Sequence, residues 1–167
     1  MKKVMAAWIV VSAALSWPGP LTAHHSLVQF DTTAPLWVKG TVVRFDLVNP
    51  HVRFFLDQRG EDGQMRRWVV DGPPSNNLAR MGIGPNFLKA GDVIEVCGFV
   101  LKEEFASQRK LPPANSNPNA LSGRALSGHL LVMPSGKRRY WSDYGVLHKC
   151  LNPGEDAETL RREAFGR

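Results

Sequence analysis

Alternating hydrophobic and polar residues predict that most of this chain is β-structure. In the segment 51–57, Val52, Phe54 and Leu56 occupy every second position, so one face of a strand would be hydrophobic. Other segments share this alternation or are rich in β-branched and aromatic residues. We therefore expect six strands, at residues 37–45, 51–57, 65–71, 93–101, 126–133 and 138–141.

Two helices are expected around these strands. After the strand breaker Gly72-Pro73-Pro74, Ser75 or Asn76 is expected to cap a short helix through Leu78 and Met81, and Pro85 is expected to end it. A last helix over 153–167 carries acidic residues in its first turns and arginines near its end, as the helix dipole favours. Three strands, a helix and two more strands is the order of an OB-type barrel, whereas a β-sandwich needs more strands and no such helix. We expect a mostly all-β fold, an OB-type barrel of five to six strands.

The N-terminal residues have the three parts of a secretory signal. Lys2 and Lys3 precede an apolar run that ends at Trp17, and the small residue Ala23 follows two prolines. The run is too short to span a membrane. We expect cleavage after Ala23 and a periplasmic or secreted protein, divided into a signal peptide (1–23), a barrel domain (24–152) and a C-terminal helix (153–167).

Charge and hydropathy restrict the partners of the chain. The 167 residues carry a net charge of +6, and loss of Lys2 and Lys3 with the signal leaves +4. Such a surface suits a soluble basic protein, and an exported protein rarely meets nucleic acid, so we expect no nucleic-acid partner. No second apolar run approaches about 18 residues, so no membrane span is expected after cleavage.

The only two cysteines, Cys97 and Cys150, are expected to form one disulfide in an oxidising compartment. Strand alternation places Cys97 on the same face as Glu95, which is the outer face of the barrel. A tail segment laid over this face would bring Cys150 to it. The alternative is two unpaired thiols.

A series of short motifs resembles an uncharacterised family of exported bacterial proteins, a domain of unknown function. The resemblance covers roughly residues 23–100 and implies export and a small β-barrel, but no established activity. In chain order, its motifs are His24-His25-Ser26, Phe30-Asp31, Gly40-Thr41-Val42, Asn49-Pro50-His51, Trp68, Gly72-Pro73, Leu78-Ala79-Arg80-Met81-Gly82 and Leu88-Lys89-Ala90-Gly91-Asp92-Val93.

Histidines at the mature N-terminus suggest copper as a candidate cofactor. The free amine and imidazole of His24 could supply two nitrogen ligands, and His25 or His51 a third, as copper(II) favours. The alternative is a frayed terminus and a His51 that only caps a turn. His129 is expected to be a packed or surface ring, and His148 would lose a neighbouring thiolate ligand if Cys150 is oxidised.

Two other segments are candidates for binding. Lys137, Arg138 and Arg139 lie beside Tyr140 and Trp141, a mixture of cations and aromatics that could hold an anion. The alternative is a solvated hairpin with its aromatic rings folded inward. Residues 105–123 are loop-like and long for a compact domain, which indicates a functional or mobile segment.

Motifs for catalysis are missing from the sequence. It contains no Gly-x-Ser-x-Gly elbow, no glycine-rich phosphate loop and no Cys-x-x-Cys pair. Its aspartates cannot be paired into an acid–base site from spacing alone. The sequence therefore predicts a non-catalytic, exported binding module of unknown ligand, with a periplasmic copper-binding protein as the alternative.

Overall fold

Six strands form one sheet that closes on itself in this computed structural model, which describes residues 27–106 and 124–166. Each strand begins and ends within two residues of its expected position. The strands are β1 (Leu36–Asp46), β2 (Arg53–Arg59), β3 (Met65–Asp71), β4 (Val93–Val100), β5 (Arg124–Val132) and β6 (Arg138–Tyr140).

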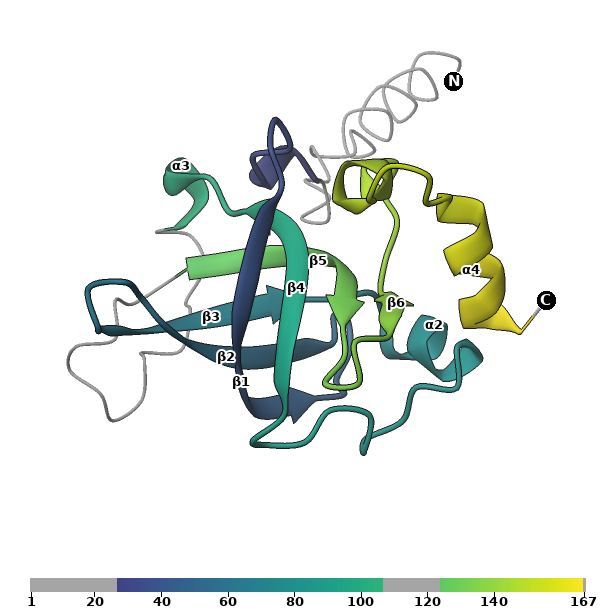
Figure 1. The fold of residues 1–167 in the computed structure, drawn as a ribbon, viewed down its shortest axis with the longest axis horizontal. Coiled ribbons are helices and arrows are strands. Elements are labelled where there is room, and N and C mark those ends of the chain that lie inside the picture. The colour runs from purple at the N-terminus through teal and green to yellow at the C-terminus, as the bar shows by residue number, and fades with distance from the viewer. Residues whose placement is uncertain (1–26, 107–123, 167) are drawn as a thin grey trace, which may run out of the picture.

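The order of the strands is β3-β2-β1-β4-β5-β6, and a parallel pairing of β3 with β5 closes the barrel (Figure 1). The first half of β1 pairs with β4, and its second half pairs with β2. β6 extends the sheet beyond β5 by an antiparallel pairing. The expected OB-type barrel, with a helix between the third and fourth strands, is confirmed.

Glycine allows two strands to approach closely at one irregular point of the barrel. The register of β4 against β5 shifts between Cys97 and Gly98. A Cβ atom at Gly98 would lie 2.2 Å from the carbonyl oxygen of Ser127, closer than any side chain permits. This position therefore requires glycine for the bend of the sheet.

The helices are α2 (Ser75–Arg80), α3 (Glu103–Ala106) and α4 (Ala157–Phe165), with 3₁₀ turns η1 (Leu27–Gln29) and η2 (Leu147–Cys150). α2 ends at Arg80, because Gly82 adopts a left-handed φ of 69° well before Pro85. α4 begins later than residue 153, because the Asp156 side chain accepts hydrogen bonds from the N–H groups of Glu158 and Thr159 and caps the helix there.

One helical turn was not expected. α3 includes Phe105 and Ala106, which the sequence placed at the start of a long loop. Phe105 packs against a hydrophobic cluster beside the barrel, and this contact with residues distant in sequence favours the helical turn. The rest of that expected loop, 107–123, lies outside the described residues.

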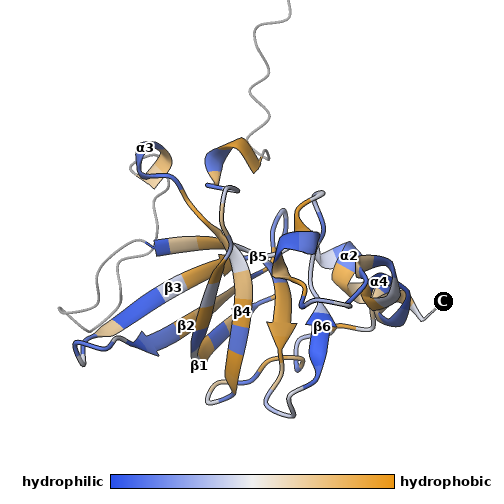
Figure 2. Ribbon diagram, turned by 45° about the horizontal axis from the view of Figure 1, so that its top comes forward, coloured by the Kyte–Doolittle hydropathy of each residue, from blue (hydrophilic) through white to orange (hydrophobic). Residues whose placement is uncertain are grey.

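Hydrophobic side chains fill the barrel and also cover part of its outside. The inner core includes Phe54, Trp68 and Trp141. Two smaller clusters lie on the outer face of β4 and β5, where the segment before β1 contributes Phe30 and η2 contributes Leu147. In Figure 2, β5 is accordingly largely hydrophobic, whereas much of β3 is hydrophilic.

Candidate functional site

An open groove of about 740 Å³ lies at the mouth of the barrel, between the first half of β1 and the β2–β3 hairpin. Residues 36–38 line one side, and residues 58–62 line the other. Arg124, the first residue of β5, also lines it. Its volume falls within the range of roughly 300–1,000 Å³ that is typical of ligand sites.

The groove exists because β1 and β2 separate. Their pairing ends with Thr41 opposite Asp57. Beyond this point, Gln58 and Arg59 continue to pair with β3, while Leu36 to Gly40 pair with β4. One edge of β1 is thus left facing the groove within the part of the chain that the structure describes.

The backbone of β1 presents hydrogen-bonding groups to this opening. The N–H of Val42 donates to the carbonyl of Asp92, and the carbonyl of Val42 accepts from Gly91, so the backbone of Val42 faces β4. Successive residues of a strand turn their backbone groups to opposite sides. The N–H and C=O groups of Trp37 and Lys39 therefore face away from β4 and toward the groove.

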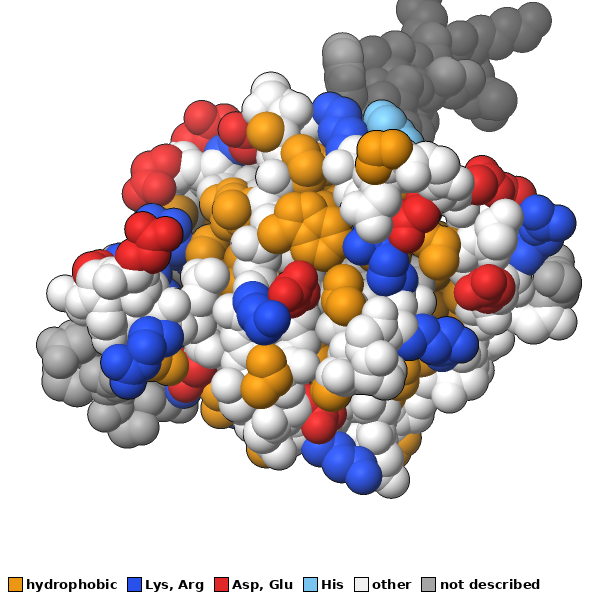
Figure 3. All heavy atoms as spheres, viewed as in Figure 1, with side chains coloured by type: hydrophobic (Ala, Val, Ile, Leu, Met, Phe, Trp, Pro, Cys, Tyr) orange, Lys and Arg blue, Asp and Glu red, His pale blue; other side chains and the backbone are white. Residues whose placement is uncertain are grey.

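Aromatic rings lie on both sides of the opening. Trp37 is 38% exposed, and the guanidinium of Arg138 lies 5.2 Å from the centre of its ring. Trp68 is buried on the other side, where its indole N–H donates to Gln58 over 2.9 Å. The guanidinium of Arg124 lies 5.5 Å from the Trp68 ring. Figure 3 shows hydrophobic side chains over β1 and β4 with charges of both signs interspersed.

Two arginines of the hairpin are paired with aspartates. Arg66 binds Asp62 with both nitrogens of its fork, and this lowers the pKa of the Asp62 carboxyl. Arg67 donates to both oxygens of Asp57, at 2.7 and 2.8 Å, and its pKa is raised. Charge around the groove is thus largely balanced, so backbone groups and aromatic surface are its main binding elements.

The predicted copper ligands are only partly described. His24 and His25 lie outside the described residues. His51 lies in the β1–β2 loop, with its Nδ1 3.1 Å from the carbonyl oxygen of Gly72. If Nδ1 carries the proton, it donates to this carbonyl and the ring lone pair is on Nε2, as in many metal-binding histidines. No group of three acidic, histidine or cysteine side chains able to hold a metal occurs among the described residues. Copper binding stays a prediction.

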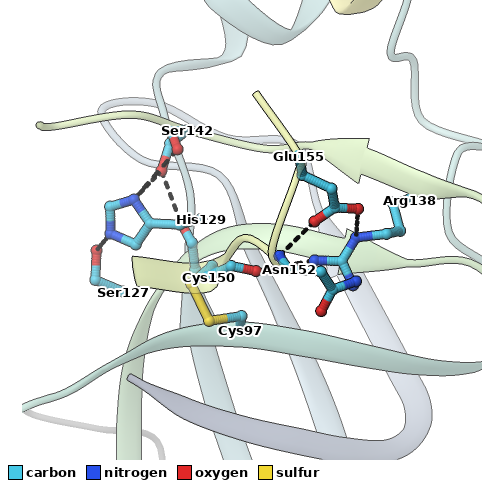
Figure 4. Close-up of a disulfide and its surroundings, with 9 residues drawn as sticks. Cys97, Ser127, His129, Arg138, Ser142, Cys150, Asn152 and Glu155 are labelled. Atoms are coloured by element: carbon cyan, nitrogen blue, oxygen red, sulfur yellow. Dashed lines mark hydrogen bonds and ion pairs between the residues drawn. A yellow bond between two sulfur atoms is a disulfide. The ribbon is translucent and has the colours of Figure 1, made fainter. Parts of the chain in front are cut away.

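The predicted disulfide is confirmed. Cys97 and Cys150 are joined, with their Cα atoms 5.8 Å apart (Figure 4). Both residues are buried, and they pack with Leu130 and Leu147. Cys97 lies on the outer face of β4, as its alternation with Val96 predicted, and η2 covers it there.

Two of the three predicted anion ligands, Arg138 and Arg139, point to different parts of the structure. Arg138 lies 2.8 Å from Glu155, and it donates to the carbonyl oxygen of Cys150 over 2.8 Å. Arg139 lies over the ring of Phe87, 5.9 Å from its centre. Because neighbouring residues of a strand point to opposite faces, the two guanidinium groups do not share one surface. Anion binding by these arginines with Lys137 stays a prediction.

His129 is a packed ring, as expected. It is fully buried beside β6, with Nε2 3.3 Å from the Ser127 hydroxyl and Nδ1 3.2 Å from the Ser142 carbonyl (Figure 4). Burial lowers its pKa to about 4, against the opposing effects of the Ser142 hydrogen bond and the Asp143 charge. Both serines are buried, and the hydroxyl of Ser142 donates a hydrogen bond over 2.6 Å to the carbonyl oxygen of Gly128. This cluster therefore offers no accessible nucleophile.

Sequence reasoning did not identify the groove. Strand alternation already places Trp37 and Lys39 together on the outer face of β1, opposite the buried Val38. A tryptophan on an outer face was the available signal. The open groove beside this tryptophan, however, depends on the residue at which the pairing of β1 with β2 ends. The local sequence pattern does not indicate that residue.

A protein-family profile matches more than half of the chain. The sequence profile of DUF6152, a family of unknown function, matches residues 10–108. These residues include both sides of the groove apart from Arg124. No curated protein matches the chain. Within the described ranges, no helix has the length and apolar character needed to cross a membrane.

Proposed function

The chain belongs to the DUF6152 family of unknown function, and we propose that it is a non-catalytic binding module that holds an extended segment of a partner polypeptide along β1. One observation carries this proposal. The backbone groups of Trp37 and Lys39 face an open groove on the side of β1 that β2 has left. A free strand edge is a template for one more strand.

Addition of a strand would supply affinity and specificity from different groups. Backbone hydrogen bonds from Trp37 and Lys39 would supply sequence-independent affinity, while alternate side chains of the partner would supply specificity. One set of partner side chains would meet Leu36, which is only partly buried, because Val38 and Trp68 line the groove but are buried beneath its surface. The other set would meet the exposed ring of Trp37, and tryptophan is a frequent anchor at interfaces. The expected partner segment therefore alternates apolar and polar residues.

A proline at Lys39 tests the backbone contribution directly. Proline has no N–H, and the N–H of Lys39 faces the groove rather than β4, so Lys39→Pro should block a partner strand while keeping the pairing with β4. Lys39→Ala is the matched control, because it removes the ion pair with Glu95, at 3.0 Å, but keeps the N–H.

The experiment begins with a display library of random linear peptides panned against the full chain. Enriched peptides should bind the natural chain and Lys39→Ala with similar Kd values, and Lys39→Pro at least about tenfold more weakly, as expected for one or two lost hydrogen bonds. Thermal unfolding of each variant confirms that it is folded. Absence of any enriched peptide, or equal binding by a folded Lys39→Pro protein, would overturn the proposal.

Export to the periplasm or the exterior is part of this proposal. The Cys97–Cys150 disulfide supports it, because such bonds persist in oxidising compartments. The intact mass of the protein recovered outside the cytoplasm should correspond to a chain that begins at His24. A mass that retains residues 1–23 would contradict cleavage after Ala23.

Copper binding is the second candidate function, and the position of His51 favours it. The contact between its Nδ1 and the Gly72 carbonyl would hold the imidazole ring in a fixed orientation, as contacts of this kind do for many metal-binding histidines. The processed protein should bind one copper(II), and one extra residue before His24 should abolish binding by separating the amine from the imidazole. Replacing His148 is the control and should change nothing. Equal copper affinities with and without the extra residue would reject the site.

A further inference from the structure

A second cleft, of about 650 Å³, lies between α2, β6 and α4. α2 contributes Asn77 and Arg80, and β6 contributes Tyr140. The other lining residues come from α4, which begins 77 residues after the end of α2 (157 − 80). In Figure 1, α2, β6 and α4 lie together at one end of the barrel, away from the tip of the β2–β3 hairpin.

Positive charge dominates this cleft. α4 adds Arg161, Arg162 and Glu158 to the lining, so that with Arg80 three guanidinium groups accompany one carboxylate. Glu158 lies 3.8 Å from Arg161, and Arg162 donates only a long hydrogen bond of 3.4 Å to Thr159. Among the described residues, neither Arg80 nor Arg162 forms an ion pair with a carboxylate. The cleft therefore has cationic groups available for a ligand.

Aromatic rings form the apolar part of the same cleft. The rings of Tyr140 and Phe165 are 6.0 Å apart and meet at 61°. Burial raises the pKa of the Tyr140 phenol, while the nearby charge of Arg161 acts in the opposite direction. The hydroxyl thus keeps its proton at neutral pH and can donate a hydrogen bond beside the arginines.

A smaller hollow of about 70 Å³ continues this aromatic side. It shares Asn77, Tyr140 and Phe165 with the cleft, and Met81 and Trp141 also line it. Asp143 is a further lining residue of the hollow. An anionic group would therefore stay at the arginine end, and an apolar group would face the rings.

We propose that this cleft binds a small organic phosphate or sulfate ester, with its oxyanion among Arg80, Arg161 and Arg162 and its apolar part against Tyr140 and Phe165. Guanidinium groups match the oxygens of such esters with paired hydrogen bonds. The volume suits a small molecule. Tyr140 and the residues of α4 lie beyond residue 108, so the segment that the family profile matches contributes only the α2 side of this cleft.

The test uses the full chain with three probes: phenyl phosphate, phenyl sulfate and inorganic phosphate, titrated by calorimetry. Phenyl phosphate should bind at one site, at least about tenfold tighter than inorganic phosphate, because the ring adds apolar burial. If phenyl sulfate binds with equal affinity, the site accepts both kinds of ester. If phenyl phosphate binds and phenyl sulfate does not, the site is specific for phosphate esters. No binding of either ester would overturn the proposal.

Variants locate the site. Arg161→Gln with Arg162→Gln, and separately Arg80→Gln on the other helix, should each weaken phenyl phosphate binding about tenfold or more, because hydrogen bonds to charged groups are lost. Arg59→Gln, in the β1 groove, is the matched control and should have less than about a twofold effect. An equal loss in the control would overturn the site. Lys39→Pro should retain ester binding. A negative result for the ester cleft can therefore be distinguished from a negative result for the proposed peptide groove.

Discussion

The guanidinium of Arg138 donates a hydrogen bond over 2.8 Å to the carbonyl oxygen of Cys150, whose sulfur is bonded to β4. The same side chain lies 2.8 Å from the Glu155 carboxylate and over the ring of Trp37. Arg138 therefore connects the tail before α4 to the aromatic residue beside the groove along β1. It is a structural residue as well as a surface cation.

Replacing Arg138 should destabilise the fold. Arg138→Met keeps most of the side-chain volume but removes the hydrogen bond to Cys150 and leaves Glu155 without its cation. We expect the free energy of unfolding to fall by about 2 kcal/mol, since both side chains are only partly exposed. Urea unfolding measures the change. Lys137→Met, at an exposed neighbouring position, is the control, and an equal effect of the two substitutions would contradict the role of Arg138.

Removing the disulfide should have a larger effect. The bond closes a loop with a sequence separation of 53 residues. In the chain-entropy model, such a loop contributes roughly 4 kcal/mol, so the Cys97→Ala, Cys150→Ala double variant should unfold at a much lower urea concentration. Addition of reductant to the denatured natural chain should lower its refolded stability to a similar extent. An unchanged unfolding midpoint in both experiments would show that the bond does not stabilise this fold.

Acid should destabilise the protein through His129. Its pKa is about 4 in the folded chain, against about 6.5 when unfolded, because burial disfavours the charged ring. The unfolded chain therefore takes up this proton first as pH falls. The contribution of the neutral His129 ring to the free energy of unfolding is fully present above pH 6.5. It is lost as the pH falls from about 6.5 to 4, and the loss is on the order of 3 kcal/mol.

Unfolding free energies measured across this pH range test the role of His129. His129→Gln keeps a polar side chain but cannot titrate, so its stability should change less between pH 6.5 and 4. Hydrogen bonds lower the pKa values of Asp31, Asp62 and Asp156 below 3.8. The stability that these aspartates contribute is therefore lost only at a lower pH than the stability contributed by His129. Identical slopes for the natural chain and His129→Gln would contradict the assignment.

The cap of α4 should support the arginine cleft. Asp156 accepts hydrogen bonds from the N–H groups of Glu158 and Thr159, at 3.3 and 2.8 Å. Asp156→Ala should lower the unfolding temperature, whereas Asp156→Asn, which can also cap, should lower it less. Thermal unfolding compares the two variants. If alanine and asparagine behave alike, the cap does not determine where α4 begins.

The strands could be predicted from sequence because their signal is local. Alternation at positions such as Val52, Phe54 and Leu56 reports the two faces of a strand, whatever its neighbours are. The disulfide could be predicted because two cysteines allow one pairing. α3 could not, since Phe105 becomes helical through packing beside the barrel.

By itself, the sequence determined the order of the six strands, the presence of a helix between the third and fourth strands, and the pairing of Cys97 with Cys150. Each of these depends on short-range alternation or on composition. Tertiary structure alone decided where the pairing of β1 with β2 ends and which partners Arg138 has. It also decided that Arg80 and Arg161 line the same cleft. These features depend on the closure of the barrel and on the packing of the tail, which bring together residues whose local patterns carry no information about one another.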